Sequence, residues 1–172
     1  MDIFIEKLIK RKRSGKDYAI TVAAVLLTLL IGYLFLAFFG EFFGLWLAVL
    51  AGLGFLCYRI ISAQNIEFEY SLTNNELDID KIISKRKRKH LITIDIKKIE
   101  LLAPISSEQF KHESGSATIT RSLDYSSGTK NANTYFAVFF GNDGLKSLLI
   151  FEPNEKMLTG IKRYIPNKVR TA

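Results

Sequence analysis

Cysteine, histidine and proline are scarce in this chain of 172 residues, which has one cysteine, two histidines and three prolines. The single cysteine, Cys57, excludes an internal disulfide and fits a reducing compartment. His90 and His112 stand in different segments with no cysteine beside them, which does not make a zinc site. We therefore expect no metal and no cofactor.

Catalytic signatures are missing as well. A nucleophilic hydrolase needs a serine or cysteine near a histidine and an orienting group, and no such relay is evident. Ser106-Ser107 and Ser126-Ser127 stand in loop-like composition, which is typical of solvated turn residues. Neither a P-loop nor a Gly-x-Gly-x-x-Gly motif occurs. The sequence therefore favours a protein that is not an enzyme.

Charge is absent from two long stretches, Tyr18–Phe39 and Phe42–Tyr58, which Glu41 separates. Each stretch is long enough to cross a hydrocarbon core of about 30 Å at about 1.5 Å per residue. A soluble protein of this size has no core that could bury two helices apolar on every face, and the first stretch is too long for a signal peptide. We expect two transmembrane helices, about residues 18–39 and 42–60, within a membrane segment of residues 18–61.

Basic residues mark the cytoplasmic side. Six precede the first span, namely Lys7, Lys10, Arg11, Lys12, Arg13 and Lys16. Arg59 ends the second span, so the positive-inside rule places both termini in the cytoplasm of a cell whose plasma membrane holds the protein. Residues 1–17 form the basic N-terminal segment, and Met1–Arg13 is expected to be a short amphipathic surface helix. The net charge of +7 indicates an anionic partner, most simply inner-leaflet lipid.

The second span carries a stripe of small residues, Gly44, Ala48, Ala51 and Gly52. Such a stripe lets another helix approach closely. The neighbour is either the first span of the same chain or a second copy in a homodimer. Neither span carries a mid-membrane charge of the kind that marks an ion pathway, so we do not expect transport by this chain alone.

Seven stretches with strand character follow the spans, and an amphipathic helix follows them. The strands are expected at residues 66–72, 77–80, 91–94, 100–105, 117–124, 134–140 and 145–151. Polar segments at Ser106–Ser116 and Tyr125–Asn133 are expected to be loops. The helix begins at Pro153 or Asn154 and ends before Pro166. Its apolar stripe consists of Met157, Leu158, Ile161, Tyr164 and Ile165.

The run Phe68–Ile79 resembles bacterial pleckstrin-homology-like domains that follow paired membrane spans. Their pattern has a tyrosine, a leucine-threonine pair, a turn and a leucine-x-isoleucine strand, which here are Tyr70, Leu72-Thr73, Asn74-Asn75 and Leu77 to Ile79. The resemblance covers roughly residues 66–165. It implies an α+β membrane protein with a seven-stranded antiparallel PH-like barrel or sandwich over residues 64–166, a C-terminal helix and a tail at 167–172. It implies no activity, because this fold hosts lipid binding, peptide binding and structural roles.

One run of basic residues stands out after the spans: Lys85, Arg86, Lys87, Arg88, Lys89 and His90. It is either a solvated hairpin that keeps the domain soluble or a contact for anionic lipid headgroups. No aromatic residue is interleaved with the charges, so nucleic acid is not expected. We expect a membrane-anchored, non-catalytic binding or scaffolding module whose domain engages the membrane surface or a protein partner. The alternative is an accessory subunit of a larger membrane complex that packs through its two spans.

Overall fold

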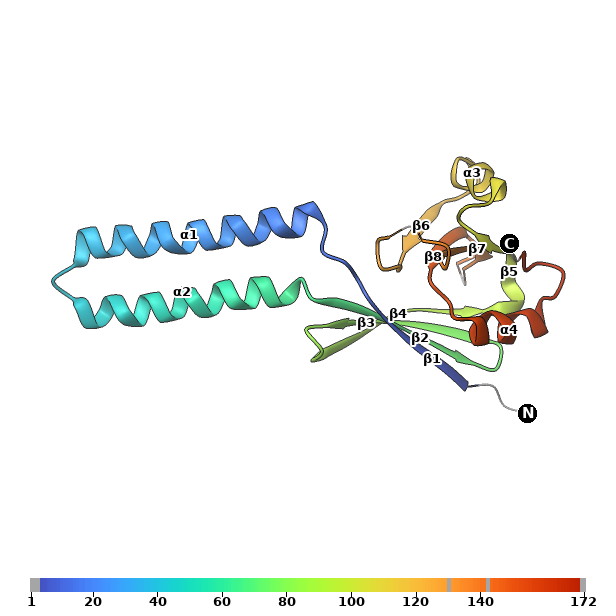
Figure 1. Cartoon of the computed structure of the whole chain (residues 1–172), viewed down its shortest axis with the longest axis horizontal. Helices are drawn as coiled ribbons and strands as arrows, with labels where there is room; N and C mark the ends of the chain where they lie inside the picture. The colour runs from blue at the N-terminus through green and yellow to red at the C-terminus, as the bar shows by residue number, and fades with distance from the viewer. Residues whose placement is uncertain (1–3, 130, 142, 171–172) are drawn as a thin grey trace. The chain divides into compact units, whose positions relative to one another are not determined.

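A computed structural model describes residues 4–129, 131–141 and 143–170. These residues form eight strands, two long helices, two short helices and one 3-10 turn (Figure 1). They separate into two compact units, each described by itself. The helical unit contains Arg13–Ile66 and Ile83–Arg86. The sheet unit contains Met1–Lys12, Glu67–Ile82 and Lys87–Ala172.

The helical unit is built on α1, Gly15–Phe39, and α2, Phe43–Ala63, which lie side by side as a hairpin (Figure 1). Ser14 caps α1, because its side chain accepts from the Asp17 N–H while the Asp17 carboxylate accepts from the Ser14 N–H at 2.8 Å. Both helices are long and apolar enough to cross a membrane, and nearly all their large apolar side chains are exposed. The two predicted apolar helices and the tight turn between them are therefore present.

α1 and α2 contact each other through small and polar residues of α1. The Trp46 indole Nε1 donates to the Gly32 carbonyl at 3.0 Å. A Cβ at Gly32 would lie 3.3 Å from Leu50 Cδ1, so the small residue at this position allows the helices a close approach. At the other end of the hairpin, Thr21 Oγ1 lies 3.0 Å from Gln64 Oε1.

The first sheet of the sheet unit has the order β1-β2-β3-β4. Its strands are β1 Phe4–Lys10, β2 Ile66–Thr73, β3 Glu76–Ile83 and β4 Lys87–Asp95. β1 runs antiparallel to β2, from Phe4 opposite Thr73 to Lys10 opposite Glu67. Because β1 precedes the long helices and β2 follows them, the helical hairpin is inserted between two neighbouring strands of one sheet.

The predicted surface helix over Met1–Arg13 is wrong for the described residues, of which Phe4–Lys10 form β1. Ile9 is buried and Ile5 is half-buried, whereas Phe4 and Leu8 are exposed, which is the alternation of a strand. β2 supplies backbone partners for this segment. The domain therefore includes β1 and does not begin at residue 64.

The second sheet has the order β5-β7-β8-β6. Its strands are β5 Ile99–Pro104, β6 Arg121–Asp124, β7 Tyr135–Phe140 and β8 Lys146–Phe151. The seven expected strands are thus all present among the described residues, and β1 is an eighth. The sheet is not purely antiparallel, because β6 runs parallel to β8. The expected loop after β5 contains a short helix, α3, Glu108–Ser114.

The C-terminal helix α4, Glu155–Tyr164, confirms the predicted helix. The Asn154 side chain caps it by accepting from the Met157 N–H at 2.8 Å. Met157 and Ile161 are fully buried, so the predicted apolar stripe packs into the core.

The segment after α4 pairs with the outer edge of β5. The Leu102 N–H donates to the Lys168 carbonyl at 2.9 Å, and the Arg170 N–H donates to the Leu102 carbonyl at 2.8 Å. The described part of the predicted tail therefore covers this edge, while residues 171 and 172 lie outside the described residues.

Candidate functional site

The basic run begins in the turn between β3 and β4. Ser84 and Lys85 both have positive φ, 53° and 55°, and the Arg86 N–H donates to the Ile83 carbonyl at 3.1 Å. Two central residues with positive φ define a type I′ hairpin turn, which usually takes asparagine and glycine. We call Ile83–Arg86 the hairpin tip. Its Lys85 and Arg86 side chains are exposed.

The hairpin tip is bonded to the C-terminal end of α2. The Ser84 N–H donates to the Asn65 carbonyl at 2.8 Å, and the Ser84 hydroxyl donates to the Ser62 carbonyl. The Ser62 carbonyl lies in the last turn of α2, and Asn65 directly follows the C-cap residue Gln64. The tip consequently belongs to the helical unit. Its two cations lie at the end of the helical hairpin where α1 begins and α2 ends.

The rest of the basic run, Lys87 to His90, is the start of β4. Arg88 pairs with Glu69 at 2.5 Å and approaches Asp80 at 3.9 Å, and His90 Nδ1 lies 2.9 Å from the same Asp80. The run is therefore not six equivalent cations. All six side chains are exposed, but Arg88 and His90 lie against Glu69 of β2 and Asp80 of β3.

The small-residue stripe of α2 does not lie against α1. Gly44, Ala48, Ala51 and Gly52 are all exposed, and a Cβ at Gly44 or Gly52 would meet nothing within 4 Å. The interpretation that the first span is the neighbour of this stripe is therefore wrong. Small residues occur on several sides of these helices. The bond from Trp46 to Gly32 shows that α2 contacts α1 through a different face.

The predicted solvated loop Tyr125–Asn133 contacts a buried carboxylate, that of Glu152. Ser127 donates to Glu152 Oε1 through its N–H at 3.0 Å and its hydroxyl at 2.6 Å, and both residues are buried. Ser126 is buried too and donates its hydroxyl to Asp124 at 2.7 Å. The prediction that these serines are solvated is wrong, because an acid 25 residues further along the chain accepts from Ser127.

Residues around Glu152 and Ser127 also contact β1 and the segment that follows it. Tyr70 of β2 is fully buried, and its hydroxyl donates to the Tyr125 carbonyl at 2.5 Å; burial raises the pKa of this phenol. Lys7 of β1 stands opposite Tyr70. Burial lowers the pKa of the Lys7 amine, and the Glu152 carboxylate opposes this shift. The Lys12 N–H then donates to the Ser127 carbonyl at 2.8 Å.

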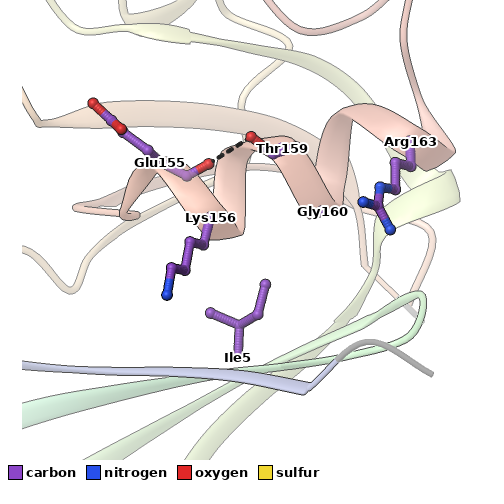
Figure 2. A pocket seen from close by; sticks show the side chains of 6 residues that line it. All are labelled: Ile5, Glu155, Lys156, Thr159, Gly160 and Arg163. Carbon is purple, nitrogen blue, oxygen red and sulfur yellow. Dashed lines mark hydrogen bonds between the residues drawn. The ribbon is translucent and has the colours of Figure 1, made fainter. Parts of the chain in front are cut away.

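A groove lies between β1 and α4, with a volume of about 410 Å³. Figure 2 shows Ile5 between the strand and the helix, with Lys156 and Arg163 extending from α4 on either side of Gly160. Glu155 and Thr159 complete its lining, and the Thr159 hydroxyl donates to the Glu155 carbonyl at 2.8 Å. The groove is open, and its lining contains two basic residues and one acidic residue. Its position could not be predicted, since β1 was not expected to be a strand.

Two sheets of short strands and one C-terminal helix packed into their core define a PH-like module, with a helical hairpin inserted after its first strand. Within the described parts of the chain, no group of three His, Cys, Asp or Glu side chains could hold a metal ion. The chain belongs to the bacterial PH-like domain family (DUF6106), whose family model matches residues 1–171. The match includes β1 and both long helices. A PH-like domain is a binding or scaffolding module. No curated protein and no solved structure matches the chain.

Proposed function

We propose that this chain is a membrane-anchored, non-catalytic module whose hairpin tip contacts anionic lipid headgroups on the cytoplasmic side. Two features of the helical unit support the anchor. α1 and α2 expose apolar side chains in nearly every direction, as lipid-facing helices do. Glu41 lies in the turn at one end of the hairpin, and basic residues lie at the other, which is the charge bias of a cytoplasmic end.

The bonding of the hairpin tip to α2 is the observation that carries the headgroup contact. It adds two cations to those at the ends of the helices. The basic residues at this end of the helical unit are Arg13, Lys16, Arg59, Lys85 and Arg86. A cation near an anionic leaflet gains about 1 kcal/mol before salt screening.

Native mass spectrometry of the full chain in mild detergent tests this contact. The protein would be offered equal amounts of phosphatidylglycerol and phosphatidylcholine, and the ratio of the two bound lipids measured. We expect a preference for phosphatidylglycerol that falls in Lys85→Gln/Arg86→Gln, by at most about thirtyfold if each charge contributes about 1 kcal/mol.

The matched control removes two exposed charges elsewhere, in Lys111→Gln/Lys162→Gln. It should keep the preference of the native chain. Equal ratios in the tip variant and the native chain would mean that the tip is only solvated.

The exposed stripe of Gly44, Ala48, Ala51 and Gly52 favours a second candidate, an accessory subunit or homodimer that packs through α2. In that case Gly44→Leu/Gly52→Leu should abolish co-purification with the partner in gentle detergent while leaving the lipid ratio unchanged. Unchanged co-purification would count against packing through this stripe.

A further inference from the structure

β1 is an outer strand of its sheet and has one neighbour, β2. The other edge of an outer strand carries backbone N–H and C=O groups that can pair with a further strand. β5 is also an outer strand, but its edge is covered by the chain's own segment around Val169, which bridges to Leu102. β6 has only four residues. β4, the outer strand at the opposite side of the first sheet, lines a pocket of about 460 Å³ whose other wall belongs to the second sheet. Strand β1, with seven residues, is the outer strand that borders the groove beside α4.

The groove beside β1 has the length and charge to hold an extended chain. Lys156 and Arg163 are seven residues apart in α4, which is about 10 Å along the helix axis. Three residues of extended chain cover about the same length. Acidic side chains two to four positions apart on one face of such a chain would reach both cations, and Ile5 offers an apolar contact between them.

From this arrangement we propose that the groove between β1 and α4 binds an extended acidic segment of a protein partner, which pairs with β1 as an added strand. The inference names the kind of partner for the module proposed above and rests on that proposal.

Charge favours such a partner over a second copy of this chain. If β1 of two copies paired antiparallel about its centre, Lys7 would stand opposite Lys7, and like charges directly opposite destabilise a strand pair. An acidic strand instead meets the cations of the α4 wall. Within the groove lining these cations are Lys156 and Arg163, against Glu155.

The test uses the full chain in nanodiscs of neutral lipid, so that headgroup binding by the hairpin tip does not contribute. The probes are an array of heptapeptides in which valine, isoleucine or phenylalanine alternates with aspartate or glutamate, and a matched array with lysine as the charged residue. The tightest binder is then measured by fluorescence anisotropy. We expect acidic peptides to bind and basic ones not to bind.

Reversing the charge of the groove should change its preference from acidic peptides to basic ones. Lys156→Glu/Arg163→Glu is expected to weaken the acidic peptide at least about tenfold and to admit basic peptides. Lys162→Glu, on the same helix but outside the groove lining, should leave the affinity unchanged. If the double reversal lowers the melting temperature, Lys156→Gln/Arg163→Gln replaces it, with the same loss expected.

Backbone pairing has its own signature in the peptide. Because a strand points alternate N–H groups to opposite edges, methylating the backbone nitrogens at one set of alternate positions should abolish binding, and methylating the other set should not. Equal effects of the two sets, no binding by any acidic peptide, or insensitivity to charge reversal would each overturn the proposal. So would a disulfide between one chain with Glu6→Cys and a second with Leu8→Cys, both in a Cys57→Ala background, because these positions stand opposite each other in an antiparallel pairing of two copies about Lys7 and the bond would assign the edge to a second copy. None of these outcomes bears on the lipid ratio that tests the hairpin tip.

Discussion

Glu152 is a buried acid whose hydrogen bonds join segments distant in sequence. In Glu152→Gln we expect the free energy of unfolding to fall by about 1–3 kcal/mol, because Ser127 loses a charged acceptor for its N–H and hydroxyl. Urea unfolding measures this loss. Glu155→Gln, which changes an exposed acid at the start of α4, should alter stability little. Equal effects of the two substitutions would mean that the Ser127 bonds contribute nothing.

The same substitution should change the titration of Lys7. Burial lowers the pKa of its amine and the Glu152 carboxylate raises it, so removing the carboxylate should lower the pKa further. A folded-state pKa below the unfolded value means that the unfolded chain binds more protons between the two. The fold therefore gains stability as pH rises through that alkaline window, and gains more in Glu152→Gln. NMR titration of the lysine side chain would contradict this if the pKa rose.

Two substitutions of Lys85 distinguish the effect of its charge from the effect of its backbone conformation. Its φ of 55° is costly for a residue with a Cβ, by about 1 kcal/mol. Lys85→Gly should therefore raise the free energy of unfolding although it removes a side chain, whereas Lys85→Gln should leave it nearly unchanged. Both should weaken phosphatidylglycerol binding alike. A glycine variant no more stable than the glutamine variant would argue against the type I′ turn.

Among the elements, β1 decides whether the sheet unit can fold without the helices. Residues 66–172 alone leave β2 as an unpaired edge and remove the contacts of Ile5 and Ile9. We expect this fragment to aggregate. A fusion of residues 1–12 to residues 66–172 through a short glycine-serine linker should be monomeric and unfold cooperatively.

Gel filtration and urea unfolding compare the fragment with the fusion. Ile5→Asp/Ile9→Asp in the fusion removes the inward apolar side chains of β1 and should make it behave like the fragment. Equal stability of the fragment and the native fusion would show that β1 is dispensable.

Periodicity predicted most elements because their signals are local. The alternation from Ile66 to Leu72 predicted β2, and the stripe containing Met157 and Ile161 predicted α4. β1 was missed because its apolar residues, in a segment this short, fit either period. The partner that decides between them, β2, comes after the helical hairpin.

The candidate sites depended on contacts that the sequence does not show. Ser127 stands in a polar segment, and only the fold brings Glu152 to it. The exposed cations of the basic run could be read directly from the sequence, but the pairing of Arg88 with Glu69 requires three strands to lie side by side. The groove beside β1 could not be predicted, because the sequence did not predict β1 as a strand.

In the proposed topology of the whole molecule, the start of α1, the end of α2 and the hairpin tip all lie on one side of the membrane. Cations at the ends of α1 and α2 favour the cytoplasm, and the turn at Glu41 should then face outward. In a Cys57→Ala background, Glu41→Cys should react with an impermeant maleimide in intact cells. Lys111→Cys, exposed in α3, should react only after permeabilisation. Mass-shift gels read both reactions. Labelling at position 111 but not at position 41 in intact cells would reverse the orientation. The tip cations would then lie on the outer side, and the proposed contact with inner-leaflet lipid would fail with it.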